Sequence, residues 1–241
     1  MISQGSRLSV RGAWWSYARG LIIRYLPGVL PGIAARVDVM HQHGLKPWSG
    51  AWNVMIEMGF SIWTGGIIFL ATGWWQRIPS WGTWLSIAVI SSGLIVIGAL
   101  NTFDDKLSAW RNSLRIPRVN LKTSIAITGY QMLNWLWLGW STLWLVRNLG
   151  SVDVSLGYIT GAYAISWVIG FLAVFVPSGL GVREAVMIAL LSPVLGPTAI
   201  TLSIATRLIF TAGEALNFGF SWLSHPRHHE NLYALDNTEK K

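Results

Sequence analysis

The chain has no cysteine and few charged residues. Asp, Glu, Lys and Arg make up 12% of its 241 residues, about half of the ~25% expected of a soluble domain. The absence of cysteine excludes disulfides, thiolate metal sites and cysteine nucleophiles. A soluble core of this length could not hide a 52% share of hydrophobic residues. The composition therefore excludes a soluble enzyme, a disordered tail and a disulfide scaffold, and indicates an integral membrane protein.

The formal net charge is +8, which in a soluble domain would suggest nucleic-acid binding. Here the basic residues lie mostly in the segments between apolar runs, where they report orientation and contact with anionic lipid head groups. We therefore expect membrane lipids as partners and no nucleic acid.

Long apolar runs predict an all-α, polytopic helical membrane protein. A spanning helix needs roughly 20 mostly apolar residues, and the runs are too long and continuous for a membrane β-barrel. We expect about five long transmembrane helices and two short broken or re-entrant helices. The long runs are 52–75, 83–103, 125–147, 154–176 and 198–224, and the short ones are 12–26 and 183–195. The first short run fits either an interfacial amphipathic helix or the second half of a broken helix.

The distribution of basic residues predicts the orientation. Five Lys and Arg residues lie in 104–124, whereas the loop around 76–82 offers only Arg77 and the loop around 147–153 only Arg147. The positive-inside rule therefore places 104–124 in the cytoplasm, together with a predicted loop over 29–50. We expect a transmembrane domain over 1–224 and a short polar tail over 225–241, on the cytoplasmic side if 183–195 and 198–224 together leave that side and return to it.

The most informative segment is VPSGLGVRE, residues 176–184. Pro177 ends the preceding helix, Gly179 and Gly181 permit a sharp turn, and Arg183 and Glu184 open the next helix. Within a bilayer, free amides at such a helix start and the arginine would favour an anionic group. An ordinary interfacial turn is the alternative interpretation.

A segment with a weaker form of the same pattern lies about 150 residues earlier. It is RYLPGVLPG, residues 24–32, and Arg36 follows it. It shares the proline–glycine break and the downstream arginine. Corresponding breaks in two halves suggest an inverted repeat with a site near the bilayer midplane, although coincidence is an alternative because proline and glycine are common in membrane helices.

Three charged residues, Glu57, Arg207 and Glu214, lie inside apolar runs. An unpaired charge there costs about 2.5–3.5 kcal/mol even on the insertion scale. Arg207 and Glu214 are seven residues apart, too far for a direct pair along one helix, so each needs another partner. We consider Glu57 as the partner of Arg207, and the alternative to a functional role is a purely structural ion pair.

The sequence contains no assembled catalytic constellation, phosphate loop or dinucleotide fingerprint. Asp104 and Asp105 lack a third acid at the spacing of a diphosphate-metal motif, and no acidic or cysteine cluster accompanies His41 and His43. We expect no metal site and no cofactor.

At PSGLGVREA the chain resembles the lysylphosphatidylglycerol synthase transmembrane-region family of flippase-like membrane proteins, whose signature is similar to Pro-Gly-Gly-x-Gly-x-Arg-Glu-Ala. Ser178 replaces its first glycine. The Arg24–Gly28 segment resembles the family's earlier Arg-Tyr-Leu-Pro-Gly element, and Arg207 resembles an arginine in its last long helix. The similarity runs from about residue 15 to 224.

The resemblance implies work on lipids rather than lipid aminoacylation, because the soluble aminoacyl-transferase domain of the best-understood members has no counterpart after residue 224. The chain begins almost at the first motif, and members commonly carry two or so helices before it. A shortened member, a start assigned too late and a protein completed by a partner are three open explanations.

Three functions remain open: a lipid translocase of the bacterial or archaeal cytoplasmic membrane, a membrane-embedded lipid or glycan transferase that uses Glu184 or Glu214 as base, and a non-transporting partner of a glycosyltransferase or lipid synthase. We favour the first, which is not an enzyme and moves or binds an anionic, aminoacyl-modified or glycosyl-modified lipid. The oligomeric state is open. The predicted substrate-binding residues are Arg24, Tyr25, Pro27, Gly28, Arg36, Glu57, Pro177, Gly179, Gly181, Arg183, Glu184, Arg207 and Glu214.

Overall fold

The computed structural model of the chain describes residues 9–26, 30–74, 119–149, 153–173 and 175–224, with a few isolated positions between 84 and 113. The predicted helix 83–103 is therefore not described as a continuous element. Most of the basic segment 104–124, the motif residues Pro27 and Gly28, and the tail 225–241 also lie outside the described residues.

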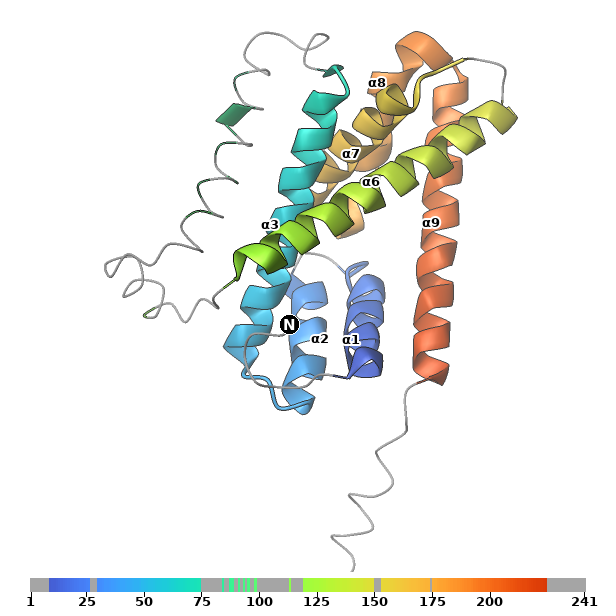
Figure 1. Cartoon of the computed structure of the whole chain (residues 1–241). Coiled ribbons are helices and arrows are strands. Elements are labelled where there is room, and N and C mark those ends of the chain that lie inside the picture. Colours follow the sequence, from blue (N-terminus) through green and yellow to red (C-terminus); the bar gives the residue numbers. More distant parts are fainter. Residues whose placement is uncertain are drawn as a thin grey trace, which may run out of the picture.

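Seven α-helices and one short 3-10 turn make up the described residues, which contain no strand (Figure 1). The all-helical prediction is confirmed for this part of the chain. The elements are α1 (Val10–Ile23), α2 (Leu30–Gln42), α3 (Pro47–Ala71), α6 (Leu121–Leu149), α7 (Leu156–Leu172), η2 (Pro177–Gly179), α8 (Val182–Leu195) and α9 (Thr198–Leu223).

Three stretches of the described residues are long and apolar enough to cross a membrane: α3, the segment Pro177–Leu195 that joins η2 to α8, and α9. The first and the third correspond to the predicted long runs 52–75 and 198–224. The second contains the run 183–195, which was predicted to be a short broken or re-entrant helix and reaches this length only together with η2. The run 125–147 is helical within α6, which is not among the three, and α7 is a shorter apolar helix of 17 residues.

The α7 helix ends earlier than the predicted boundary at residue 176, because of Pro177. A proline clashes with the carbonyl four residues before it if a helix continues, and here that carbonyl belongs to Ala173. The helix accordingly ends at Leu172, with Ala173 as its C-cap. The α8 helix then begins at Val182, so the proline–glycine segment separates two helices as predicted.

The predicted loop over 29–50 is wrong, because residues 30–42 form α2. Pro31 is the second residue of this helix, where a backbone amide needs no partner within the helix. Gly32 allows a close approach to α1, since a Cβ atom there would lie 3.2 Å from the Cβ of Arg24. The pair Pro31–Gly32 thus marks a helix start and a helix contact rather than a long loop.

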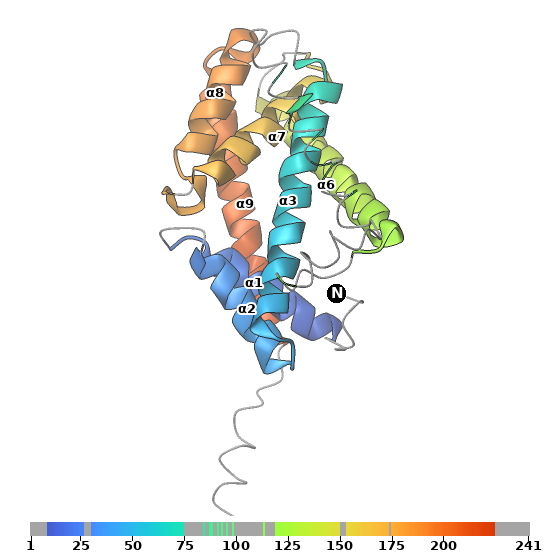
Figure 2. The same cartoon turned by 90° about the vertical axis from the view of Figure 1, so that its left-hand side faces the viewer.

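Two helical pairs lie at opposite ends of the molecule. In Figure 1, α1 and α2 lie beside the lower half of α3 and α9, whereas α7 and α8 lie beside their upper half. Figure 2 shows that the end of α1 and the start of α2 face the turn between α7 and α8. Because α1 packs against both α2 and α9, it is the first arm of a helical hairpin rather than an isolated interfacial helix.

The charged residues of α9 lie near its middle. Arg207 follows the first residue of the helix by nine positions, and Glu214 precedes its last residue by nine. At 1.5 Å per residue, each lies about 13 Å from an end of the helix. The residues that bind Arg207 and Glu214 therefore also lie level with the central part of α9.

The core surrounds α7, which packs against α3, α6 and α8. Small buried residues of α7, including Gly161, Ala162 and Ala164, allow these helices to approach closely. By contrast, the outer face of α9 exposes large apolar side chains, among them Ile204, Leu208, Leu216 and Phe220. Such a surface is rare on soluble monomers and suits contact with lipid.

Candidate functional site: an arginine-lined cavity between two helix breaks

A cavity of about 150 Å³ lies between the facing ends of the two helical pairs. Both breaks contribute to its wall, together with α3 and α9. Its lining includes Tyr17, Gly20, Arg24, Gly32, Arg36, Glu57, Ser61, Trp167, Gly170, Ser178, Gly179, Arg183 and Arg207. The structure therefore brings six of the predicted site residues to one cavity: Arg24, Arg36, Glu57, Gly179, Arg183 and Arg207.

The second break is a tight turn that rests directly on α7. Ser178, Gly179 and Gly181 have φ angles of 50°, 65° and 82°, a backbone region that favours glycine. A Cβ atom at Gly179 would lie 2.5 Å from the carbonyl oxygen of Gly170, so only glycine fits this contact. Pro177 and Gly181 shape the turn but do not line the cavity.

Glu184 caps the helix that follows this turn. Its Oε2 atom accepts a hydrogen bond of 2.6 Å from the backbone amide of Gly181. Its other oxygen, Oε1, lies 3.6 Å from Nε of Arg207. The predicted site residue Glu184 thus connects the start of α8 to the middle of α9.

Arg183 is a buried cation without a carboxylate partner in the part of the chain that the structure describes. Its side chain is buried, and no ion pair joins it to an acid among the residues that the structure describes. It donates a hydrogen bond to the hydroxyl of Tyr163, and its guanidinium lies 4.6 Å from the centre of that ring and 5.6 Å from the ring of Phe210. Tyr163 and Phe210 are neutral, so the positive charge is not compensated there.

The position of Arg183 in its helix adds to this excess of positive charge. It is the second residue of α8, and the N-terminus of a helix carries a partial positive charge of its own. Burying an uncompensated ion costs several kcal/mol. The end of the cavity at Arg183 is consequently a favourable place for an anion.

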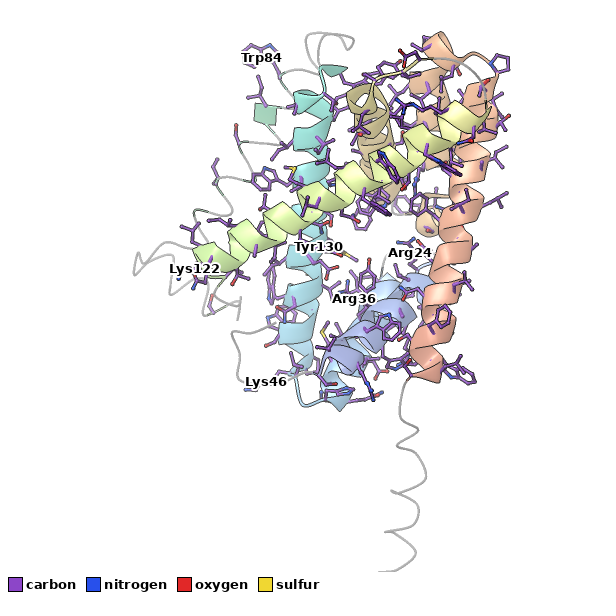
Figure 3. All side chains as sticks on the ribbon, turned by 45° about the vertical axis from the view of Figure 1, so that its right-hand side comes forward. Arg24, Arg36, Lys46, Trp84, Lys122 and Tyr130 are labelled. Carbon is purple, nitrogen blue, oxygen red and sulfur yellow. The ribbon has the colours of Figure 1, made fainter. Side chains whose placement is uncertain are left out.

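The other three arginines of the cavity each face a different carboxylate. Arg24 of α1 pairs with Glu214 of α9, whose Oε2 atom also accepts a 2.8 Å hydrogen bond from the hydroxyl of Tyr25. Arg36 of α2 lies 2.6 Å from Oε2 of Glu57 on α3. Figure 3 shows Arg24 beside α9 and Arg36 between the α1–α2 hairpin and α3. Tyr25 and Glu214 therefore support the cavity through Arg24 rather than lining it.

The predicted pair between Glu57 and Arg207 is wrong. Glu57 forms its ion pair with Arg36, which lies in the segment predicted as a loop. Arg207 faces Glu184 instead, because α8 packs against α9. Arg207 also donates a 3.5 Å hydrogen bond to the carbonyl of Ser178. The expectation that Arg207 and Glu214 find partners outside their own helix is confirmed.

Several polar atoms of these residues have no hydrogen-bond partner within the described part of the chain. They are Nε of Arg24, Nε of Arg36, Nη2 of Arg207 and Oε1 of Glu184, and all four are buried. Buried donors without partners are uncommon in native proteins. The arginine cluster therefore retains hydrogen-bonding capacity beyond its ion pairs.

Three residues that shape the site were not among the predicted site residues: Tyr163, Phe210 and Tyr17. The ring of Tyr17 lies 5.2 Å from the guanidinium of Arg36. Tyr163 stands within a run of otherwise mostly apolar and small residues, and its hydroxyl could have marked it as a candidate. Nothing in the sequence distinguishes Phe210 from the other apolar residues of α9.

Comparison with known protein families matches residues 1–212 to the family described as the lysylphosphatidylglycerol synthase TM region. No curated protein and no solved structure matches the chain. The match covers almost all of the described helices, including both breaks and Arg207, and it confirms the resemblance inferred from the two motifs. With its long apolar helices, the chain is a multi-pass membrane protein that belongs to the lysylphosphatidylglycerol synthase TM region family.

Proposed function

We propose that the protein binds the head group of an anionic, aminoacyl-modified or glycosyl-modified lipid between the two breaks and moves that lipid across the cytoplasmic membrane of a bacterium or archaeon. The observation that carries this proposal is Arg183, a buried guanidinium without a carboxylate partner among the described residues, which lines a cavity in the middle of an apolar helical fold. An anionic head group would supply the missing negative charge.

The size of the cavity supports a head-group site rather than a site for a whole lipid. A cavity of about 150 Å³ has the size of protein cavities that hold a small organic molecule such as benzene. This volume suits a phosphate with a small substituent. The acyl chains would lie against the exposed apolar surface of the helices.

The arrangement of the two helical pairs supports a translocation pathway. We propose that they form an inverted pair, because they lie at opposite ends of the long helices and the described helix ends of the first pair face the turn of the second (Figure 2). In membrane transporters, broken helices of this kind expose backbone only toward a cavity or within the protein. The sequence contains no nucleotide-binding motif, so we propose passive or ion-coupled movement.

Lipid movement by the reconstituted protein tests this function. Fluorescent phosphatidylglycerol in liposomes is followed by adding a membrane-impermeant quencher, with protein-free liposomes as the baseline. We expect the wild type to move the lipid between leaflets, Arg183→Ala to lose most of this activity, and Arg183→Lys to retain part of it because the charge remains.

Arg19→Ala is the matched control. Arg19 of α1 is also an arginine, but it pairs with Asp38 at the surface and does not line the cavity. It should therefore move lipid like the wild type. Equal movement by the wild type and Arg183→Ala would contradict the role of Arg183, and no movement above protein-free liposomes would contradict the proposed transport.

A further inference from the structure

We infer that the cavity selects a lipid head group with one net negative charge and no ammonium group, such as a phosphodiester whose other polar groups are hydroxyls. This inference rests on the proposed function and narrows it, because the function alone would also admit aminoacyl-modified lipids. Its basis is the balance of charge around the cavity.

The arginines of the cavity outnumber the carboxylates that face them by one. Arg24, Arg36 and Arg207 face Glu214, Glu57 and Glu184 respectively, and Arg183 has no acid among the described residues. A monoanion next to Arg183 would balance the cluster. A head group with no net charge would leave the cluster cationic, and one with two negative charges would leave it anionic.

Each of the three carboxylates around the cavity in the described part of the chain already forms an ion pair with an arginine. Glu57, the only acid among the described lining residues, lies 2.6 Å from Arg36. Glu214 is held by Arg24 and Tyr25, and Glu184 is held by Gly181 and Arg207. An ammonium group could recruit one of these acids only by leaving an arginine without its partner, which is costly in a buried site.

Two aromatic rings could attract an ammonium group in place of a carboxylate, but an arginine already lies beside each of them. The guanidinium of Arg36 lies 5.2 Å from the ring centre of Tyr17, and that of Arg183 lies 4.6 Å from the ring centre of Tyr163. The ring face is what attracts a cation. Arg36 and Arg183 therefore already make the cation–π contacts that an ammonium group would need.

The neutral polar groups of the lining suit hydroxyls. The hydroxyl of Ser61 donates to the carbonyl of Glu57 and accepts a 2.6 Å hydrogen bond from Gln131, and Ser178 is also a lining residue. These groups can exchange hydrogen bonds with a glycerol or sugar hydroxyl without any change in charge.

Lipid affinities of the purified full-length protein test the inference. Thermal unfolding in detergent is followed while short-chain phosphatidylglycerol, phosphatidylethanolamine, phosphatidylcholine and lysylphosphatidylglycerol are titrated, since a ligand that binds the folded state raises the unfolding midpoint. We expect phosphatidylglycerol to bind at least tenfold more tightly than each of the three amine-bearing lipids. Equal or tighter binding of any of these three would overturn the inference.

Deacylated phosphatidylglycerol and inorganic phosphate test whether the cavity binds a lipid head group or a soluble phosphate compound. We expect both to bind at least tenfold more weakly than the intact lipid, because they cannot bury acyl chains. Equal binding would assign the cavity to soluble phosphate esters and would overturn the inference.

Introducing a free carboxylate provides a second, independent test. Ser61→Asp places an acid in the lining beside Gln131, whereas Ser61→Asn gives a side chain of the same shape without the charge. We expect Ser61→Asp to reduce the preference for phosphatidylglycerol over lysylphosphatidylglycerol about tenfold relative to Ser61→Asn. Equal preferences in the two variants would overturn the inference.

The two proposals fail in different ways. If the amine-bearing lipids bind as well as phosphatidylglycerol and are moved between leaflets, the charge selection is wrong and the translocation function stands. If phosphatidylglycerol binds selectively but no lipid crosses, the selection stands and the translocation function is wrong.

Discussion

Arg207 and Glu214 lie seven residues apart on α9, and each contacts residues at the cavity-facing end of a different helical pair. Arg207 faces Glu184 and the carbonyl of Ser178 at the second break, whereas Glu214 binds Arg24 and Tyr25 at the first. The single helix α9 therefore joins both breaks near its middle. Any movement of one helical pair relative to the other must stretch or break one of these two attachments.

The attachment through Glu214 is expected to contribute to stability. In Glu214→Leu, Arg24 keeps its charge but loses its acid, and we expect the free energy of unfolding to fall by about 1–3 kcal/mol, the usual cost of leaving a buried polar group unsatisfied. The double variant Arg24→Met/Glu214→Leu should recover most of this loss, because an apolar pair of similar volume often replaces a buried ion pair without cost. Unfolding midpoints in detergent measure both effects, and a double variant no more stable than Glu214→Leu would contradict the proposed pair.

Close packing at Gly170 is expected to position Arg183. A Cβ atom at Gly170 would lie 2.9 Å from the Cβ of Arg183, so Gly170→Ala must displace the start of α8. We expect it to lower the free energy of unfolding by about 1–3 kcal/mol, as overpacking typically does, and to weaken phosphatidylglycerol binding although no charge has been removed.

Gly213→Ala is the control for this packing effect. Apart from its chain neighbours and the nearby backbone of α9, no atom of the described residues lies within 4 Å of a Cβ placed at Gly213, and alanine favours a helix over glycine by roughly 1 kcal/mol. This variant should be as stable as the wild type or slightly more stable. Equal unfolding midpoints for the two alanine variants would show that the contact between Gly170 and Arg183 is unimportant.

The backbone at Ser178 predicts an ordered series of substitutions. A φ of 50° is unfavourable for residues with a Cβ atom, by roughly 1–2 kcal/mol, and worst for β-branched ones. Ser178→Gly should therefore be neutral or stabilising by at most about 1 kcal/mol, since glycine relieves this cost but also loses more entropy on folding. Ser178→Val should be clearly destabilising, and unfolding midpoints in the order Val, Ser, Gly from lowest to highest are expected. A valine variant as stable as the wild type would contradict the left-handed turn.

Part of the fold followed from local patterns. The run containing Glu57 predicted α3 because a long apolar stretch has no alternative to a helix in a membrane. The break between α7 and α8 followed from Pro177, which cannot continue a helix. The α2 helix was missed because Pro31 and Gly32 resemble loop residues, whereas their role depends on where the helix starts and on how closely α1 approaches.

The site was predicted only as a set of residues. A charge inside an apolar run is costly unless another group compensates it. Arg207, Glu214 and Glu57 were predicted as site residues on that ground alone. Their partners could not be deduced, as the incorrect pair of Glu57 with Arg207 shows. Arg36 was the missing partner, and it was predicted to lie in a loop.

The sequence by itself determined that the chain is a helical membrane protein, where its second break lies, and which charges needed compensation, because hydropathy and proline chemistry act over a few neighbouring residues. Only the tertiary structure decided that both breaks share one cavity and that Arg183 is the cavity arginine without an acid among the described residues. The pair Arg24–Glu214 joins residues 190 positions apart, and such a pairing depends on how whole helices pack, which no local pattern of residues encodes.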